Sequence, residues 1–501
     1  MTLSALLAGL PVQLPAADPV VTGVVLDSRR VGPGDLYIGL QGATRHGAEF
    51  AAQAARAGAV AVLTDPQGAP LAAASGLPVA TTVQVREAMA VAAARCHGHP
   101  ARSMTCFAVT GTNGKSTTVL MLSAALNGAG RRCGSIGTLG ILLGDEQLPM
   151  HTSTVTTPEA PDLQAILAQF SQAGAEAMAM EVSSHALALQ RAAGITFDVV
   201  GFTNLGRDHL DFHDTIEDYF AAKARLFTPG YACRAVINAD DPAGLQLLDQ
   251  AAALGLPAVS VGSAVDCDYR ISGWRTDGAG TRFTLEHPHG TLEARLGLPG
   301  DYNVRNGALA LAMIDQAGLD MHAALPGLAR AIIPGRMQPV ELPGAQAPRC
   351  YVDFAHTPQA ITSALAALNH PGDQGRVIAV LGAGGDRDPD KREPMGRAAA
   401  RGADVVVVTD DNPRSEDPAP IRARVLAGAR ASGTTEAVDG GDRRSAIRLA
   451  LSLAGPADSV AILGKGHERT QQLADQTVEF DDVAVARQEW AALRGPLGDQ
   501  Q

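Results

Sequence analysis

CFAVTGTNGKSTTVLML, residues 106–122, is the stretch that decides the fold of this chain. A β-branched, apolar run stops at Gly-Thr-Asn-Gly-Lys-Ser and resumes as a pattern compatible with a helix. Gly111 and Gly114 allow a tight turn with inward-pointing backbone N–H groups, Lys115 adds a positive charge, and Ser116 places a hydroxyl beside a Mg²⁺. The segment therefore predicts a strand, a phosphate-binding loop and a helix that together bind ATP.

The loop is shorter than the general phosphate-binding pattern. That pattern has a glycine five residues before the second loop glycine, and this chain has Val109 there. A strand, turn and helix without a ligand is the alternative interpretation. The Lys-Ser pair directly after Gly114 favours the phosphate-binding loop over that alternative.

Length and composition indicate a multidomain globular protein. The chain has 501 residues, of which 46% are hydrophobic, so about three domains with cores of their own are expected. No uninterrupted apolar run is long enough to cross a membrane. The net charge of −12 disfavours a nucleic-acid partner, whereas local Lys and Arg side chains can still bind small anionic substrates.

The cysteines and the N-terminus favour a cytoplasmic protein. The six cysteines form no Cys-x-x-Cys pair, which is typical of reduced thiols and argues against a cysteine-bound structural metal. Residues 1–19 contain neither a basic region nor a plausible cleavage site, so we interpret them as structure rather than as a signal peptide. We expect cytoplasmic localisation and no membrane partner.

Strand-like runs alternate with Ala-rich helical stretches, which predicts an α/β fold with largely parallel sheets. The expected strands are 60–65, 107–111, 235–238, 377–382, 405–411 and 460–466. Breaks in the pattern divide the chain into domains at 1–100, 101–335 and 336–501. The central domain carries the phosphate-binding loop.

Two acidic or polar stretches follow predicted strands in the central domain. Glu181 ends a buried strand, where a carboxylate is well placed to hold Mg²⁺ on ATP phosphates, although a capping or solvated glutamate is the simpler interpretation. Residues 202–214, FTNLGRDHLDFHD, are dense in ligand-type side chains and indicate a site, with a polar loop that caps a helix as the alternative. The helix expected at 216–227 contains Lys223, and a lone lysine there ordinarily extends to the surface.

Further candidates lie at strand–loop junctions towards the C-terminus. Asn303 begins an Ala/Leu-rich helix and either caps it or reaches a nucleotide. Arg336 lies in a Pro/Gly-bounded linker, where a guanidinium can clamp a phosphate, and Asp353 and His356 precede a helix. Parallel α/β sheets gather ligands at such junctions.

The last domain offers three strands that each lead into a polar loop with Gly or Pro. These loops carry both signs of charge, on the side chains of Arg387, Asp411, Asn412, Arg414 and Glu468. Arginines and carboxylates together suit a zwitterion, because its carboxylate meets a guanidinium and its ammonium meets an acid. Ordinary surface turns would explain each loop by itself.

Ten motifs taken together resemble the Mur ligase family: GTNGKS, MEVSSH, TNLGRDHLD, AAKARLF, DYNVRN, GRM, DFAHTP, GGDRD, DNPR and GKGHE. The resemblance extends from LDSR at 26–29 to GKGHE at 464–468. It implies an N-terminal domain for a UDP-sugar, a central ATPase domain and a C-terminal Rossmann-like domain for an amino acid. The implied activity is ATP-dependent amide ligation through an acyl phosphate in cytoplasmic peptidoglycan precursor synthesis, by a monomer that uses Mg²⁺.

The resemblance also assigns site residues. The catalytic set that it implies is Lys115, Glu181, His209 and Lys223. The implied ATP-binding set is Gly111, Thr112, Asn113, Gly114, Lys115, Ser116, Thr117, Asn303, Arg336, Asp353 and His356. The implied metal ligands are Ser116, Glu181, His209 and Lys223, the last as the carbamylated lysine of the family, which would reverse the surface interpretation of Lys223.

The implied UDP-sugar contacts are Leu26, Ser28, Thr156, Thr157, Ser183 and Arg191. The chain departs from the family there, because Leu189 replaces a glutamine of some relatives and residues 43–45 differ from their pattern. The implied amino-acid pocket is Arg387, Asp411, Asn412, Pro413, Arg414, Gly464 and Glu468.

Arg414 in DNPR resembles the residue that holds the distal carboxylate of meso-diaminopimelate, so we expect that amino acid to be added to the D-Glu carboxylate of UDP-MurNAc-L-Ala-D-Glu. The same arginine would repel the bare distal ammonium of L-lysine or L-ornithine. Two competing interpretations are a folylpolyglutamate synthetase, which shares the ATP machinery, and a regulator that binds ATP without catalysis. A dehydrogenase is disfavoured, because GAGGD at 382–386 does not complete the dinucleotide fingerprint.

Overall fold

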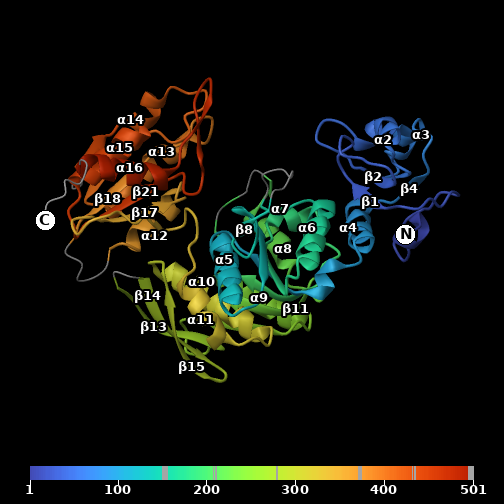
Figure 1. Cartoon of the computed structure of the whole chain (residues 1–501), viewed down its shortest axis with the longest axis horizontal. Helices are drawn as coiled ribbons and strands as arrows, with labels where there is room; N and C mark the ends of the chain where they lie inside the picture. The colour runs from blue at the N-terminus through green and yellow to red at the C-terminus, as the bar shows by residue number, and fades with distance from the viewer. Residues whose placement is uncertain are drawn as a thin grey trace. The chain divides into compact units, whose positions relative to one another are not determined.

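The computed structural model describes residues 1–148, 156–206, 208, 212–277, 280–369, 375–431, 433 and 436–494 (Figure 1). The chain divides into two compact units. The first comprises Met1–Ser272, Leu285–Leu292 and Arg305–Leu328, and the second comprises Gly273–Thr284, Glu293–Val304 and Ala329–Gln501. No helix in the described part of the chain combines the length and the apolar character that crossing a membrane requires.

The N-terminal segment forms a small parallel sheet, in which the strand order β1-β2-β3-β4 follows the sequence. Its strands are β1 (Gly23–Val25), β2 (Asp35–Gly39), β3 (Ala61–Thr64) and β4 (Val79–Thr81). The helices here are α1 (Leu3–Leu6), η1 (Gly47–Phe50), α2 (Ala51–Ala57), α3 (Ala69–Ala73), α4 (Val85–Cys96) and η2 (Pro100–Ser103). Alanines at 88, 90, 92 and 93 let α4 pack closely on the sheet in one apolar core.

The central sheet has the strand order β15-β14-β13-β12-β11-β10-β5-β9-β6-β7-β8 among the described residues. Its strands are β5 (Thr105–Thr110), β6 (Cys133–Gly137), β7 (Gly140–Leu143), β8 (Glu146–Gln147), β9 (Ala177–Glu181), β10 (Phe197–Phe202), β11 (Ala232–Asn238), β12 (Ala258–Gly262), β13 (Tyr269–Asp277), β14 (Gly280–His287) and β15 (Gly290–Leu296). Its helices are α5 (Lys115–Gly128), α6 (Ala160–Gln172), α7 (Ser184–Ala188), α8 (Ile216–Ala224), α9 (Pro242–Ala253), α10 (Asp301–Gln316) and α11 (Met321–Ala329).

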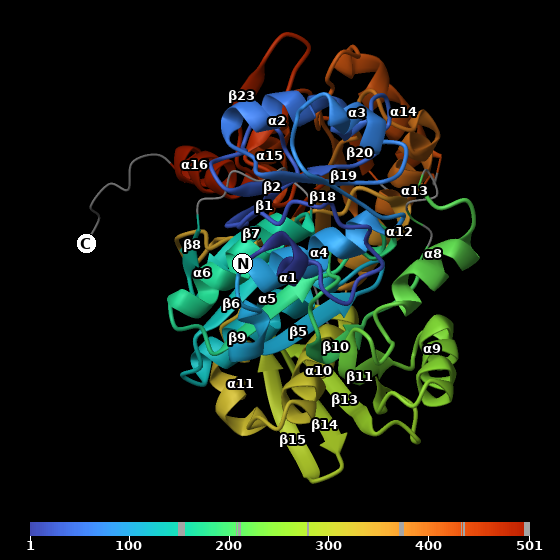
Figure 2. The same cartoon turned by 90° about the vertical axis from the view of Figure 1, so that its right-hand side faces the viewer.

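Strand β5, which leads into the phosphate-binding loop, lies between β9 and β10, and both pairings are parallel. Helix α5 follows the loop and runs beside β6 and β9 (Figure 2). Phe202 of β10 pairs with Thr110, and Glu181 of β9 pairs with Val109, so these three strands end at one edge. The register therefore gathers the loop and the residues after β9 and β10 at the carboxyl edge, where open α/β sheets bind ligands.

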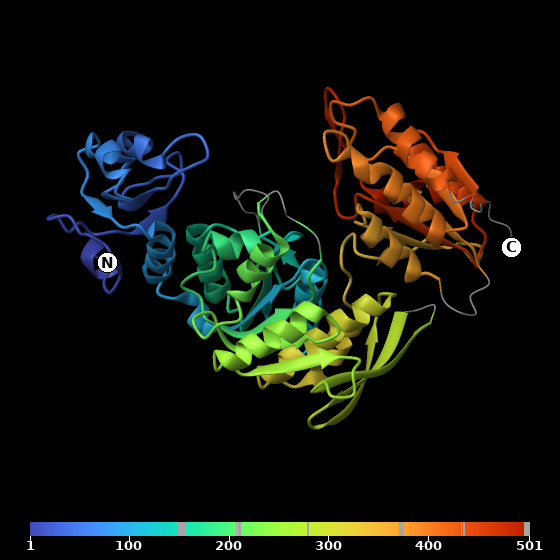
Figure 3. The ribbon, with the colours of Figure 1, turned by 180° about the vertical axis from the view of Figure 1, so that it is seen from behind.

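Additional strands lie at both edges of the central sheet. Strands β7 and β8 continue the β6 edge in antiparallel pairings. At the other edge β13, β14 and β15 lie side by side as long strands (Figure 3). These strands add to the largely parallel sheet that the sequence predicted, and β12, β11 and β10 separate β13 from β5.

The C-terminal sheet has the order β16-β17-β21-β18-β19-β20 among the described residues and is parallel except for β16. Its strands are β16 (Gln338–Pro339), β17 (Arg349–Asp353), β18 (Val377–Leu381), β19 (Val405–Val408), β20 (Glu436–Asp439) and β21 (Ser459–Leu463), and β22 (Thr470–Gln472) and β23 (Thr477–Glu479) form a separate antiparallel pair. The helices are α12 (Pro358–Ala366), η3 (Pro389–Lys391), α13 (Arg392–Gly402), α14 (Pro418–Arg430), α15 (Arg443–Leu453) and α16 (Asp482–Arg494).

Alternate residues of the C-terminal strands enter two different cores. In β18, Ala379 and Leu381 pack with α12, α13 and α14, whereas Ile378 and Val380 pack with α15 and α16. Because successive side chains of a strand point to opposite faces, helices must cover both faces of this sheet. This is the doubly wound arrangement expected of a Rossmann-like domain.

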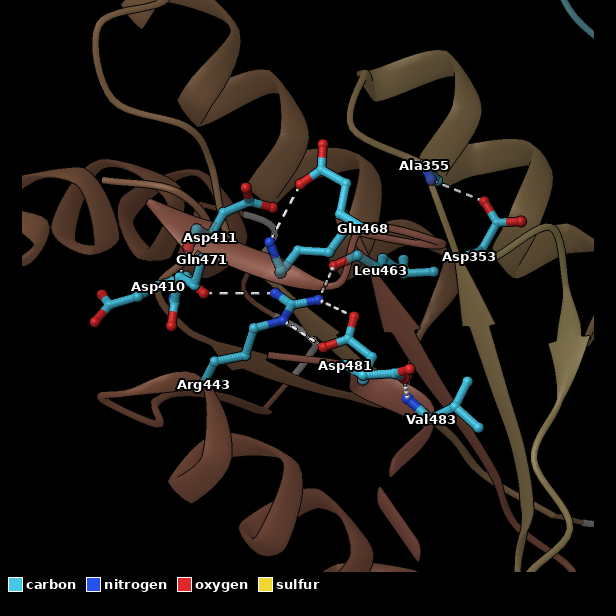
Figure 4. A network of polar contacts seen from close by, with 12 residues as sticks. Asp353, Ala355, Asp410, Asp411, Arg443, Leu463, Glu468, Gln471, Asp481 and Val483 are labelled. Atoms are coloured by element: carbon cyan, nitrogen blue, oxygen red, sulfur yellow. Dashed lines mark hydrogen bonds and ion pairs between the residues drawn. The ribbon is translucent and has the colours of Figure 1, made fainter. Parts of the chain in front are cut away.

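A buried ion pair fastens α15 to α16 in this domain (Figure 4). Nε and Nη2 of Arg443 each donate to a carboxylate oxygen of Asp482 at 2.7 Å, and both side chains are fully buried. Nη2 also donates to the carbonyl oxygen of Leu463 at 3.0 Å. The pair therefore fixes the end of β21 as well as the two helices.

We expect Arg443→Met to lower the free energy of unfolding by about 3–5 kcal/mol, because it leaves the Asp482 carboxylate buried without a counter-charge. Urea unfolding followed by circular dichroism measures the change. Arg397→Met removes an exposed arginine whose ion pair with Glu393 spans 3.6 Å, and it should cost less than about 1 kcal/mol. The double replacement of Arg443→Met with Asp482→Leu should regain most of the stability that Arg443→Met alone loses. Equal losses of stability in Arg443→Met and in the control Arg397→Met would contradict the prediction.

Candidate active site

The loop between β5 and α5 has the geometry of a phosphate cradle. Gly111 and Gly114 adopt φ of 148° and 85°, in the region that favours glycine. A Cβ on Gly114 would lie 2.5 Å from Oδ1 of Asn306, and a Cβ on Gly111 would collide with Oγ1 of Thr203. Both glycines are therefore required by backbone conformation and by close packing, as the sequence predicted for a loop that wraps a ligand.

Residues that follow β10 hold this loop in place. Asn113 donates its backbone N–H to Oδ1 of Asn204 at 3.0 Å, and Nδ2 of Asn204 donates back to the Asn113 carbonyl at 3.1 Å. The Thr203 hydroxyl donates to the same carbonyl at 2.6 Å, and the backbone N–H of Thr112 donates to the Asn204 carbonyl at 2.8 Å. The TNLG segment is thus a support of the phosphate loop.

Two lysines converge on one carbonyl oxygen of the loop. Nζ of Lys115 donates to the carbonyls of Gly111 and Thr112 at 3.0 and 2.9 Å. Nζ of Lys223 donates to the Gly111 carbonyl at 2.7 Å, and the Lys223 side chain is only 1% exposed. The surface interpretation of Lys223 from its residue pattern is therefore wrong, because this lysine points into the loop.

Burial lowers the pKa of Lys223 well below its usual value, and the nearby positive charge of Lys115 lowers it further, whereas Asp208 acts in the opposite direction. Desolvation dominates because an ammonium loses its hydration inside the protein. The Tyr219 ring lies 4.4 Å from Nζ of Lys223, and the Tyr219 hydroxyl lies 3.2 Å from Oγ1 of Thr112. The structure therefore places an amine with an increased neutral fraction beside the loop.

Glu181 is a buried carboxylate at the end of β9. Its Oε1 accepts the backbone N–H of Thr138 at 2.8 Å, its Oε2 accepts the Thr138 hydroxyl at 3.3 Å, and the residue is 2% exposed. The solvated interpretation of this glutamate is wrong, whereas its bond to the backbone N–H of Thr138 agrees with a capping role. Ser116 and Thr117 at the start of α5 are also buried, at the same edge of the sheet.

His209, the remaining residue of the predicted catalytic set, lies outside the described residues. Within the described ranges no three His, Cys, Asp or Glu side chains are grouped closely enough to hold a metal ion by themselves. Magnesium in ATP sites is bound mainly by phosphate oxygens, waters and one or two carboxylates. The buried carboxylate of Glu181 and the hydroxyl of Ser116 fit that pattern.

An aromatic cluster that the sequence did not reveal connects the loop with α7 and α8. His213 Nε2 lies 2.9 Å from the Ser184 hydroxyl, and the His213 ring packs against Phe212 and Tyr219. Helix α8 is capped by Thr215, whose hydroxyl oxygen accepts the backbone N–H of Asp218, and not by an aspartate of the polar loop. The alternation of aromatic and acidic residues in this loop concealed which of them are buried.

Four of the six predicted UDP-sugar residues lie together beside Glu181. Thr157 donates its hydroxyl to the Glu181 carbonyl at 3.0 Å and accepts the backbone N–H of Ser183 at 3.2 Å. Arg191 donates to the Thr157 carbonyl at 3.1 Å, and Oγ1 of Thr156 lies 3.1 Å from the Thr138 hydroxyl. The other two, Leu26 and Ser28, follow β1, and the Ser28 hydroxyl donates to Gln53 at 3.5 Å.

Three predicted nucleotide residues of the second unit, Arg336, Asp353 and His356, lie around or next to Phe354. The Arg336 guanidinium lies 4.6 Å from the Phe354 ring centroid, and the His356 ring lies 4.6 Å from it. Asp353 accepts the backbone N–H groups of Met337 and Ala355 at 2.7 and 2.8 Å, the second of which Figure 4 shows, and burial raises its pKa. Asn303 of α10 is buried and donates to the Pro299 carbonyl at 2.7 Å.

The predicted amino-acid residues also lie together, on the loops after β18, β19 and β21. Arg414 donates to the Gly385 carbonyl at 2.7 Å and to Oε1 of Gln472 at 2.9 Å, and Asn412 donates to Oε2 of Glu468 at 2.9 Å. A Cβ on Gly464 would lie 2.5 Å from Oδ2 of Asp411. Pro413 precedes Arg414 in the same loop, and Arg387 is exposed.

Comparison with known proteins finds three matching family models: the "Mur ligase family, catalytic domain" at residues 20–97, the "Mur ligase middle domain" at 109–314 and the "Mur ligase, glutamate ligase domain" at 335–466. The chain is similar to the UDP-N-acetylmuramoyl-L-alanyl-D-glutamate–2,6-diaminopimelate ligase of Streptomyces avermitilis, with 44% identity over 95% of this chain and 93% of the relative.

Among solved structures, one of a UDP-N-acetylmuramoyl-L-alanyl-D-glutamate–2,6-diaminopimelate ligase matches with a TM-score of 0.71 and 32% identity over 95% of this chain and 96% of that chain. A folylpolyglutamate synthase of Mycobacterium tuberculosis, complexed with ADP and AMPPCP, matches with a TM-score of 0.59 and 21% identity over 75% of this chain and 91% of that chain. The second likeness shows a shared fold.

We expect Gly114→Ala to weaken ATP binding roughly tenfold or more, because the added methyl group strains a left-handed residue and displaces Asn306 from the loop. Gly130→Ala is the matched control: Gly130 has φ of 79° and nothing within 4 Å of its Cβ position, so this variant carries the backbone strain without the collision. Nucleotide titration by fluorescence or calorimetry measures both. Equal weakening in the two variants would contradict the prediction.

Proposed function

The chain belongs to the Mur ligase family, and from this premise we propose that it is the ATP-dependent ligase that adds meso-diaminopimelate to UDP-MurNAc-L-Ala-D-Glu. The observation that carries the proposal is the convergence of Lys115 and Lys223 on the phosphate loop, with the buried Glu181 at the end of the neighbouring strand β9. The names of relatives that match nearly the whole chain support the choice of substrates. The product is an amide in peptidoglycan precursor synthesis.

The reaction requires activation of a carboxylate, because an amine that attacked the carboxylate directly would have to displace an oxide ion, which is a very poor leaving group. An oxygen of the D-Glu side-chain carboxylate attacks the γ-phosphorus of ATP, the bond to ADP breaks, and an acyl phosphate forms. The amine of the amino acid then attacks the acyl carbon, phosphate leaves, and the amine loses a proton. Lys115 and the backbone N–H groups of 111–117 stabilise the charge that moves with the phosphoryl group.

Magnesium is the metal that we propose for this site. Ser116, Glu181, His209 and Lys223 would hold it, and the ion would neutralise phosphate charge when bound. The buried carboxylate and hydroxyl at the loop fit an oxygen-loving cation. Lys223 fits as well if its amine carries a carboxylate group, because it then offers oxygen atoms rather than an ammonium.

The low pKa of Lys223 gives a chemical reason for such a modification. Only a neutral amine attacks the carbon of CO₂; a C–N bond forms, one proton leaves, and an anionic carbamate results. Burial favours the neutral amine, whereas exposed lysines remain protonated near neutral pH. We propose that Lys223 is carbamylated in the active enzyme.

The remaining assignments follow the same premise. The ATP contacts include Asn303, Arg336, Asp353 and His356, and the UDP-sugar contacts are Leu26, Ser28, Thr156, Thr157, Ser183 and Arg191. The amino-acid pocket contains Arg387, Asp411, Asn412, Pro413, Arg414, Gly464 and Glu468. The division at 1–100, 101–335 and 336–501 is supported by three separate family matches, and we propose a monomer that acts in the cytoplasm.

Competing functions are less well supported. Two relatives that are 44% and 43% identical to this chain are named as 2,6-diaminopimelate ligases, and this disfavours a lysine-adding or ornithine-adding homologue. The likeness to folylpolyglutamate synthase concerns the fold and covers 75% of this chain. A regulator without catalysis is disfavoured by the buried lysine and glutamate, since a binding module has no need of a lysine with a lowered pKa.

An amino-acid panel tests the proposed function. With ATP and UDP-MurNAc-L-Ala-D-Glu, phosphate release should depend on the amino acid and be fastest with meso-diaminopimelate, and Lys115→Ala should abolish it. Arg414→Ala should raise the KM for meso-diaminopimelate roughly tenfold to a hundredfold, because a charge-assisted contact with the distal carboxylate is lost. Equal or faster rates with L-lysine or L-ornithine would contradict the assignment.

Carbamylation of Lys223 is tested with isotope-labelled bicarbonate and NMR. The wild-type enzyme should show a carbamate carbonyl signal that Lys223→Ala lacks, and small carboxylates should restore part of the variant's activity. The signal should decrease as pH falls through the lowered pKa, because protonation removes the neutral amine. A signal that persists in Lys223→Ala, or none in the wild type, would contradict the proposal.

A further inference from the structure

Lys465 is a fully buried lysine in the loop after β21, within the segment Gly464–Glu468. The flanking Gly464 and Gly466 adopt φ of 115° and 56°, and each packs too closely for a Cβ: Gly464 against Asp411 and Gly466 against Phe354. The loop backbone is therefore fixed on both sides. The sequence pattern singled out Gly464 and Glu468 but indicated no role for the lysine between them.

The Lys465 ammonium uses all three of its donors inside the protein. Nζ donates to Oδ1 of Asn412 at 3.2 Å, to Oε2 of Glu468 at 3.2 Å and to the carbonyl of Thr470 at 2.5 Å. A buried ammonium is tolerated only when it is paired in this way. Because no donor remains and the side chain is inaccessible, Lys465 itself cannot contact a substrate.

Glu468 is held through one oxygen and is open at the other. Its Oε2 accepts from Lys465 and also from Nδ2 of Asn412 at 2.9 Å. Its Oε1 has no hydrogen-bond partner in the described part of the chain, and the side chain is 37% exposed. The carboxylate therefore has a fixed orientation with one acceptor free for a ligand.

The same network reaches the arginine of the pocket. Oδ1 of Asn412 accepts both from Lys465 and from the backbone N–H of Gln472 at 3.0 Å, and Oε1 of Gln472 accepts from Nε of Arg414 at 2.9 Å. One buried cation thus sets the positions of an exposed carboxylate and, through β22, of a guanidinium.

We propose that Lys465 is a positioning residue for the amino-acid substrate: it orients Glu468 so that Oε1 receives an ammonium group of the diamino acid. The inference rests on the proposed function, because it needs the DNPR and GKGHE loops to form the amino-acid pocket. We expect its effect on amino-acid binding, since Nζ bonds to Asn412, Glu468 and Thr470 and, among the described residues, to none of the proposed ATP contacts.

Kinetics of Lys465→Met test the inference. Methionine fills similar space without charge, and the Glu468 carboxylate that loses its partner is 37% exposed and stays solvated, unlike the fully buried Asp482 after Arg443→Met. The KM for the amino acid should rise roughly tenfold to a hundredfold, with kcat and the KM for ATP nearly unchanged. Arg424→Met, on the exposed side of α14, is the control and should change none of the three.

A double-mutant cycle separates positioning from general destabilisation. If Lys465 acts through Glu468, Lys465→Met should add little to the amino-acid KM in a Glu468→Gln background, whereas independent roles give multiplied effects. Lys465→Gln, which can still donate to Asn412, is the second variant and should give a smaller rise. Multiplied effects, or failure of both Lys465 variants to fold, would overturn the inference and make Lys465 a structural residue.

The outcomes distinguish this inference from the proposed function. All rates are measured with the amino acid that the wild-type enzyme uses best. A wild-type enzyme that releases no phosphate with any amino acid overturns the proposed function and, with it, the pocket. An active wild type whose Lys465→Met variant keeps its amino-acid KM, or raises the KM for ATP by the same factor, overturns the inference alone.

Discussion

The carbonyl oxygen of Gly111 accepts hydrogen bonds from two lysines, and the rest of the central site depends on this arrangement. Two ammonium groups around one oxygen repel each other, and the buried one bears the larger penalty because it has lost its hydration. The protein can relieve this repulsion by leaving Lys223 neutral or by admitting anions. Both responses prepare the loop for a polyphosphate, and the neutral amine is also the form that can react with CO₂.

The parallel sheet makes this convergence possible. Lys223 comes from α8, more than one hundred residues after the loop, and Glu181 comes from β9, yet β9, β5 and β10 end at a common edge. In the second unit the loops after β18, β19 and β21 gather Arg414 and Glu468 in the same manner. The Arg443–Asp482 pair contributes there, because it holds Leu463 at the end of β21, where the Gly464–Glu468 segment begins.

Much of the fold could be predicted from the sequence where apolar runs are continuous. Val405–Val408 is such a run, because both of its faces are covered, and the structure has β19 there. Strands β8 and β13 were not predicted, since β8 has two exposed residues and β13 mixes Arg, Ser and Asp with aromatic residues. Such strands are defined by their neighbours in the sheet and not by a run of their own. The site residues also divide into predictable and unpredictable ones. Gly111 and Gly114 could be predicted, because local backbone geometry requires glycine there. The burial of Lys465 and of Arg443 could not, because it depends on partners distant in sequence, Asn412 and Asp482 respectively.

The acidic composition does not oppose binding of highly anionic substrates. At physiological ionic strength, exposed charges more than about 8 Å apart are largely screened, so surface charges that make up the net charge of −12 act little on a ligand in the site. The energy of binding is set by groups inside the site, where water is excluded and charge interactions are stronger. Lys115 already occupies the loop in a bonded position, so a phosphate exchanges contacts with two neutral carbonyl oxygens for contacts with anionic oxygens instead of ordering a free side chain.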